Sequence, residues 1–136
     1  MNATTRIRFA RGLGLWAGWM DTAAGTGLLL APAWTLALMQ VPPPPPPPEA
    51  TVFVRFIGAF VFAVGATYLF GVVGSSAVRL RHLLQFTLFP RAAAGGFVTC
   101  ALVSGWLAWP WASVAVTDLG LVAVQGWLLA HEPRNH

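Results

Sequence analysis

Four long apolar stretches constrain the fold of this chain more than any other feature of its sequence. They cover residues 12–39, 51–73, 92–109 and 111–130. A helix needs about 20 largely apolar residues to cross a bilayer core, and helices satisfy their own backbone hydrogen bonds in hydrocarbon. The pattern therefore predicts an all-α integral membrane protein, with four transmembrane helices packed as one bundle and a single domain over residues 1–136.

Composition supports a membrane location and argues against nucleic acid as a partner. Hydrophobic residues make up 57% of the chain and charged residues only 9%, against roughly a quarter in an ordinary soluble domain. The net charge of +4 comes from arginines in short flanks, with no lysine and no continuous basic face, whereas nucleic-acid binding requires such a face. The expected partners are the lipid bilayer and other membrane protein subunits. The Ala-, Gly- and Arg-rich, lysine-free composition indicates a GC-rich bacterial genome. We therefore expect a multi-pass protein of the bacterial inner membrane.

The arginines outside the predicted spans predict the orientation. They lie before the first span, between the second and third, and after the fourth: Arg6, Arg8, Arg11, Arg79, Arg81, Arg91 and Arg134. The two remaining connections carry only Glu49 or no charge. Because cytoplasmic loops are enriched in arginine and lysine, we expect both termini on the cytoplasmic side.

The sequence predicts a different structure for each of three connecting segments. The proline-rich loop 41–49 is predicted outside the membrane, with its prolines in the extended polyproline II conformation. Segment 79–90 is interpreted either as a cytoplasmic amphipathic helix or as an extension of the second or third helix. Pro110 alone separates the last two stretches, which predicts a very tight hairpin.

A cleaved signal peptide that ends near Ala31-Pro32-Ala33 is an alternative for the N-terminal segment. The length of the apolar run and the presence of Asp21 argue against this alternative.

Charged side chains inside the spans are the candidate functional residues, since each is costly in hydrocarbon and must face protein or water. Arg55 and Asp118 lie at similar expected depth in the outer half, so we predict an ion pair between them. Substrate binding and proton relay are the alternatives.

A second group of polar residues is predicted near Asp21 in the middle of the first span. Spacing places Asp21 on one helix face with Gly14, Gly18 and Gly25, where helices approach closely. Tyr68, Thr99 and Gln125 lie at similar expected depth and would complete a buried polar cluster. Asp21 is either a neutral, hydrogen-bonded structural group, a protonatable or ligand-binding carboxyl, or a contact with a partner subunit.

No motif identifies a catalytic residue or a metal site. The single Cys100 excludes an internal disulfide and a site with several cysteines. His82 and His131 lie near the inner boundary, so ligation of haem or a chlorophyll stays open beside an ordinary interfacial role. A carotenoid or a quinone at a subunit interface stays open as well.

The layout resembles the small four-helix membrane proteins of the DoxX-like families. The residues that carry the resemblance are Arg11-Gly-Leu-Gly, Leu29-Leu-Ala-Pro32, Arg55-Phe-Ile-Gly58 and the lone Asp118 of the last span. Some DoxX-type proteins are membrane subunits of quinone-linked oxidoreductases. The resemblance therefore implies a non-catalytic accessory subunit of an electron-transfer complex, respiratory or photosynthetic, while the proline tract departs from the pattern. The alternative is a small oligomeric transporter or channel that uses Asp21 as its coupling carboxylate.

Overall fold

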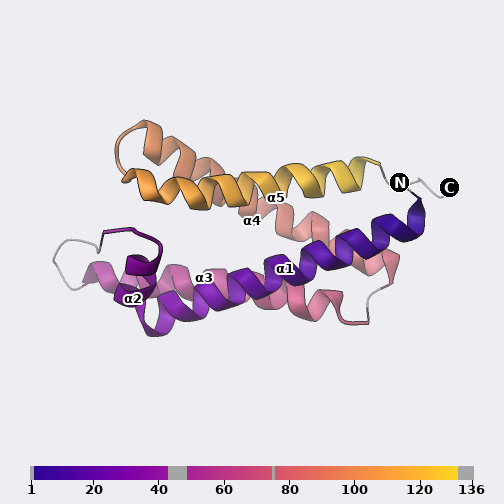
Figure 1. Cartoon of the computed structure of the whole chain (residues 1–136), viewed down its shortest axis with the longest axis horizontal. Helices are drawn as coiled ribbons and strands as arrows, with labels where there is room; N and C mark the ends of the chain where they lie inside the picture. The colour runs from indigo at the N-terminus through magenta and orange to yellow at the C-terminus, as the bar shows by residue number, and fades with distance from the viewer. Residues whose placement is uncertain (1, 43–48, 75, 132–136) are drawn as a thin grey trace. The chain divides into compact units, whose positions relative to one another are not determined.

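The described part of the chain is helical throughout and contains no strand. The computed structural model describes residues 2–42, 49–74 and 76–131. Its helices are α1 (Ala3–Leu30), α2 (Pro32–Leu38), α3 (Glu49–Val72), α4 (Ala77–Val103) and α5 (Ala112–Ala130), and the short 3-10 helix η1 (Trp109–Trp111) precedes α5 (Figure 1). The all-α expectation is thus confirmed for these residues. Most of the predicted proline loop lies outside them.

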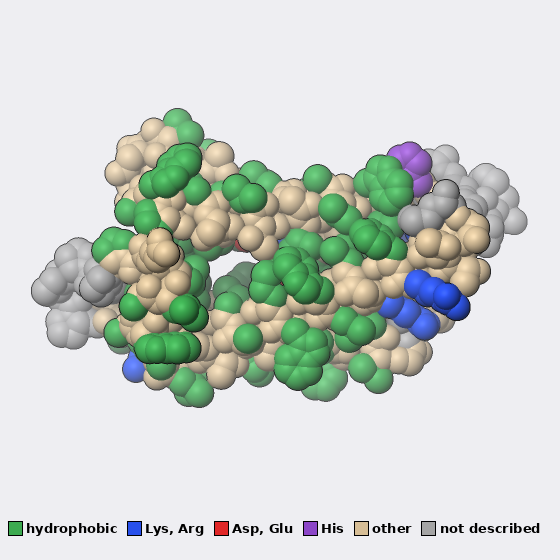
Figure 2. Space-filling model, in the orientation of Figure 1, with side chains coloured by type: hydrophobic (Ala, Val, Ile, Leu, Met, Phe, Trp, Pro, Cys, Tyr) green, Lys and Arg blue, Asp and Glu red, His purple; other side chains and the backbone are tan. Residues whose placement is uncertain are grey.

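Three helices within the described residues are long and apolar enough to cross a membrane. They are Glu49–Val72, Ala77–Val103 and Trp109–Ala130. Large hydrophobic side chains are exposed along them, as Figure 2 shows for the visible face. A water-soluble helix would bury such a surface, so these helices indicate a membrane protein. Helix α1 is not among the three, because Asp21 and several glycine, threonine and tryptophan residues lower the mean hydropathy of its residues 13–30.

The chain divides into two compact units, and α1 contributes to both. One unit is Leu13–Val73, and the other combines Met1–Gly12 with Gly74–His136. In the first unit α1 packs antiparallel against α3 through glycines on both helices. A Cβ at Gly18 would lie 2.8 Å from Leu69, and one at Gly58 would lie 2.6 Å from the backbone nitrogen of Leu29. Side chains at these positions would push the helices apart, so glycine sets their close approach.

The first predicted span is not one continuous helix. Helix α1 ends at Leu30, Ala31 leaves the helical conformation with φ −134° and ψ 61°, and α2 begins at Pro32. The residue before a proline is disfavoured in the helical region, and proline has no amide proton to continue the hydrogen-bond ladder. The expectation for residues 12–39 is therefore corrected to a long helix, a break and one short helix.

The second unit is built on an antiparallel hairpin of α4 and α5. Segment 79–90 forms the first half of α4, so the structure selects the extension of the third helix. The two helices are joined by a longer connection than the predicted single Pro110. Helix α4 ends where Gly105 takes φ +72°, and the amide of Trp106 bonds the carbonyl oxygen of Ala101 at 2.8 Å. This glycine-terminated arrangement satisfies the last carbonyls of the helix.

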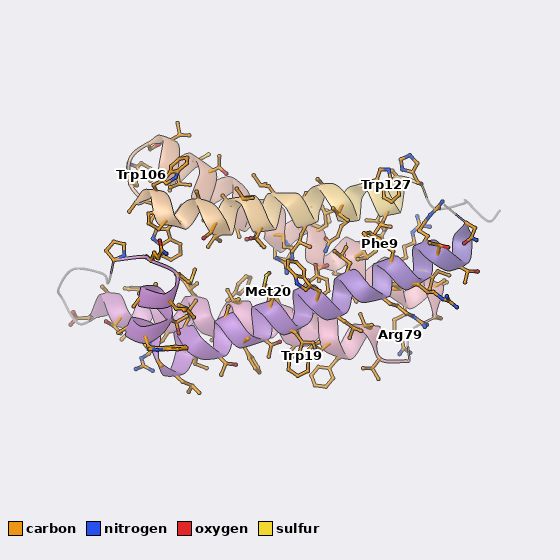
Figure 3. The ribbon with its side chains drawn as sticks, in the orientation of Figure 1. Phe9, Trp19, Met20, Arg79, Trp106 and Trp127 are labelled. Atoms are coloured by element: carbon orange, nitrogen blue, oxygen red, sulfur yellow. The ribbon has the colours of Figure 1, made fainter. Side chains whose placement is uncertain are left out.

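Figure 3 shows how the ends of this hairpin differ. Trp106 lies beyond the C-terminal end of α4, whereas Arg79 begins that helix at the opposite end, with Trp127 close to the C-terminus of α5. Tryptophan favours the membrane–water interface, where its amphipathic ring contacts both phases. Its placement near both ends of the hairpin is typical of a helix pair that crosses a bilayer.

Candidate functional site

A buried ion pair joins the two helices of the α4–α5 hairpin. The Arg91 Nη1 atom donates to the Asp118 carboxylate at 2.6 Å, and the two side chains are only 4% and 14% exposed. Gly95 lies one turn after Arg91 on α4. A Cβ at Gly95 would lie 3.2 Å from the Cβ of Asp118 and 3.0 Å from the Leu119 side chain. Glycine at this position therefore brings α5 close enough for the pair to form.

The ion pair lies well inside both helices. At 1.5 Å per residue, Arg91 is about 18 Å from the end of α4 at Val103, and Asp118 is about 9 Å from the start of α5. Gly95 faces Asp118 across the hairpin, so the long Arg91 side chain reaches about 6 Å along α4 to the carboxylate. Arg91, which the sequence assigned to a cytoplasmic flank, is thus part of a candidate membrane span. An isolated charge there would be costly, and pairing it with Asp118 is the usual solution.

Arg55 caps the C-terminal end of α1. Its Nη1 atom donates to the carbonyl oxygen of Leu29, because the break before Pro32 leaves the last carbonyls of α1 without amide donors from a following helical turn. A cationic donor is favourable at this negative end of the helix dipole. Asp118 pairs with Arg91. The expected Arg55–Asp118 ion pair stays a prediction, since the two residues belong to different units.

Asp21 lies in the seam between α1 and α3. Its side chain is only 7% exposed, and a Cβ at Gly65 of α3 would lie 2.9 Å from the Asp21 Cβ. Tyr68, one turn further along α3, is fully buried at 0% exposure and packs opposite Gly18. The structure thus brings Asp21 and Tyr68 into neighbouring turns of one packed interface. The predicted glycine face of α1 is the face that contacts α3.

The other two members of the predicted polar cluster belong to the second unit. Thr99 donates its hydroxyl proton to the Gly95 carbonyl oxygen of its own helix at 2.7 Å, and Gln125 is fully buried in α5. Thr87 likewise donates to the Leu83 carbonyl oxygen at 2.8 Å. A cluster of Asp21 with Thr99 and Gln125 remains a prediction.

The histidines occupy different positions on the hairpin. His82 is exposed on α4. His131 follows the last residue of α5, where its Nδ1 atom is 2.9 Å from the Trp127 carbonyl oxygen and its ring centroid is 5.2 Å from that of Trp127. The Arg6 guanidinium also donates to the His131 carbonyl oxygen. Because a carbonyl oxygen only accepts, Nδ1 carries the proton and Nε2 is the open nitrogen; pigment or haem ligation stays a prediction.

Sequence reasoning missed Arg91 as a site residue, although one signal was available. Arg91 and Gly95 have the spacing of adjacent turns, with Thr87 one turn before, and together they form a buried face of α4. Among the described residues no group of three His, Cys, Asp or Glu side chains is arranged to hold a metal ion. Cys100 is a free cysteine and is exposed.

Chemically, the buried charged groups are engaged in helix packing: Arg91 neutralises Asp118, and Asp21 is enclosed beside Gly65. The exposed Arg55 caps α1. Comparisons of the chain with protein-family models, with curated proteins and with solved structures find no match.

Proposed function

We propose that this chain is a four-helix protein of the bacterial inner membrane, with α1 as the fourth span and both termini in the cytoplasm. Three helices qualify as spans by length and apolarity alone. Helix α1 becomes a favourable span once it pairs with α3, because its glycine face is covered and Asp21 no longer faces lipid. Arg6, Arg8 and Arg11 at its start then mark the cytoplasmic side.

We further propose that the chain is a non-catalytic accessory subunit of a larger membrane complex. The observation that carries this proposal is the Arg91–Asp118 ion pair, in which the two charges buried in the α4–α5 hairpin neutralise each other. An enzyme or carrier would instead keep such groups available for a substrate. The exposed surface offers mostly aromatic and aliphatic side chains, including Phe53, Phe56 and Phe60 on α3, which suit lipid and neighbouring helices.

The electron-transfer part of the proposal rests on the resemblance to the DoxX-like families. Subunits of that kind accompany quinone-linked oxidoreductases, and this chain is proposed to act beside such a respiratory or photosynthetic complex. Any haem, pigment or quinone would lie at the interface with the partner. His131, with its Nε2 atom open, is the residue best arranged to reach such a group.

Copurification from native membranes tests the accessory role. The tagged full chain is extracted in mild detergent, and its partners are identified by mass spectrometry and by an absorption spectrum. We expect stoichiometric recovery of a subunit that carries a redox cofactor. Recovery of the chain alone, from membranes in which a known complex is extracted intact, would contradict the proposal.

A transporter or channel is the second candidate, and the interrupted first helix favours it. Broken helices often occur at transport sites, and Asp21 lies near the middle of residues 12–30, about 14 Å from the end of α1. In this alternative Asp21 is the coupling carboxylate. Proton-coupled flux through the chain reconstituted alone would support the transporter and exclude a purely accessory role.

A further inference from the structure

The arginines of the second unit gather at one end of the α4–α5 hairpin. The contact of Gly95 with Asp118 and Leu119 sets the antiparallel register. Counting twelve residues along each helix from this contact places the end of α5 level with about residue 83 of α4. Arg79 and Arg81 therefore extend about 3–6 Å beyond the end of α5.

The start of α1 lies at the same end of this unit. Arg6 donates to the carbonyl oxygen of His131, the residue that follows α5. Asn2 holds this segment in its first turn, since its side chain accepts the amide of Thr5 at 2.8 Å. Arg8 and Arg11 follow on the same helix, and both are exposed.

These residues form what we call the arginine end. Its members come from the first turns of α1 and α4: Arg6, Arg8, Arg11, Arg79 and Arg81. Segments 2–12, 76–90 and 121–131 contain no acidic residue, and one glutamate, Glu132, follows His131 outside the described residues. Two of the acidic residues described, Asp21 and Glu49, belong to the Leu13–Val73 unit. The third, Asp118, lies toward the other end of the hairpin and is already paired with Arg91.

We propose that the arginine end binds the headgroups of anionic phospholipids, with a preference for lipids that carry a net negative charge over zwitterionic ones. Charge complementarity supports this occupant, because the segments that form this end carry five arginines and, in the sequence, one adjacent glutamate. Arginine matches phosphate through paired N–H donors, which makes it the preferred residue for such contacts. Trp127, which is 46% exposed, lies at the same end and suits the interface. The proposal rests on insertion of the chain in a membrane and is independent of any partner subunit.

The test uses the isolated full chain in a non-ionic detergent. Phosphatidylglycerol, cardiolipin and phosphatidylcholine are added separately, and the retained lipid is measured by native mass spectrometry. We expect tighter retention of the two anionic lipids. The double variant Arg8→Gln with Arg79→Gln should reduce that preference by up to about 25-fold, since one arginine near an anionic surface contributes about fivefold. Both side chains are exposed, so circular dichroism should show unchanged helix content.

The matched control is Arg8→Lys with Arg79→Lys, which keeps the charge and should retain most of the preference. Raising the salt concentration should weaken binding in the wild type through screening. Equal retention of phosphatidylglycerol and phosphatidylcholine by the wild type would overturn the proposal. An unchanged preference of the double glutamine variant for anionic lipids would also overturn the proposal. Displacement of the lipid by millimolar inorganic phosphate would instead indicate a free-phosphate site and would overturn the lipid assignment.

Discussion

Arg91 and Asp118 form a 2.6 Å ion pair between α4 and α5, with the Arg91 side chain only 4% exposed. Removing one partner should leave an uncompensated buried charge and cost about 3–5 kcal/mol of unfolding free energy. Replacing both should cost less, because a matched apolar pair carries no such penalty. We therefore expect Arg91→Leu with Asp118→Leu to be more stable than either single variant, measured by denaturant unfolding in detergent.

A second mutant cycle is the control for this prediction. Arg55→Leu combined with Asp118→Leu should show additive effects, because each residue has another partner: Arg55 donates to Leu29, and Asp118 pairs with Arg91. Coupling in the Arg55 cycle together with additivity in the Arg91 cycle would restore the pairing inferred from sequence and refute the one described here.

Arg55 should stabilise the interrupted end of α1. Arg55→Gln shortens the donor and should cost about 0.5–1.5 kcal/mol, the net value of one hydrogen bond. The loss should be local, so hydrogen exchange at Leu28–Leu30 should accelerate more than exchange in α5. Pro32→Ala removes the residue that breaks the helix, so α1 can continue and the amide of Ala33 can bond the Leu29 carbonyl oxygen. In that background we expect Arg55→Gln to cost less, and an equal cost in both backgrounds would argue against a capping role.

Glycines in the seam between α1 and α3 should tolerate substitution by alanine less well than glycines on open helix faces. A Cβ at Gly65 would come within 2.9 Å of the Asp21 Cβ, whereas a Cβ at Gly96 would meet nothing within 4 Å. We expect Gly65→Ala to destabilise by about 1–3 kcal/mol through overpacking. Gly96→Ala, the matched control in α4, should be neutral or stabilising by up to about 1 kcal/mol, since alanine favours the helix. The two variants are compared by their unfolding midpoints in detergent. Equal effects would contradict the close packing of α1 against α3.

Hydropathy predicted the α3 and α5 helices well, because long apolar composition is what a membrane span requires. Hydropathy did not predict the features of the fold that depend on a single residue. Pro32 ends α1 within an otherwise continuous apolar run. Hydropathy also left open whether the polar segment 79–90 extends a neighbouring span, and the structure places it in the first half of α4.

The site was harder to predict than the helices, for a geometric reason. Depth estimates placed Arg55 and Asp118 level, but pairing depends on which helices are neighbours and on the reach of each side chain. Arg91 was assigned to a flank because charges usually lie outside spans. Only the packing of Gly95 against α5 shows that it faces Asp118. The glycine face around Asp21 was predictable, since it follows directly from helical spacing.

The proposed topology predicts opposite compartments for the proline-rich loop and the C-terminus. Reporter fusions inserted after Gln40 and at the C-terminus should report the periplasm and the cytoplasm, respectively. The physical basis is the bias of arginines toward one side. A fusion after Gly74, between α3 and α4, is the control and should match the C-terminus. The same compartment for all three fusions would contradict four spans.

Asp21 distinguishes the two candidate functions. It is buried beside Gly65 in the α1–α3 seam, and an amide of the same size would keep most of its hydrogen-bonding capacity while losing its ability to titrate. If the role is structural, Asp21→Asn should fold and assemble nearly as well as the wild type. Asp21→Ala, which removes the polar groups without enlarging the side chain, should lower the assembly yield. A coupling carboxylate would behave differently, because Asp21→Asn would abolish proton-coupled flux in proteoliposomes while assembly stays normal. We expect normal assembly of the Asn variant and no flux in either protein, and flux that is lost only in the Asn variant would establish the transporter instead.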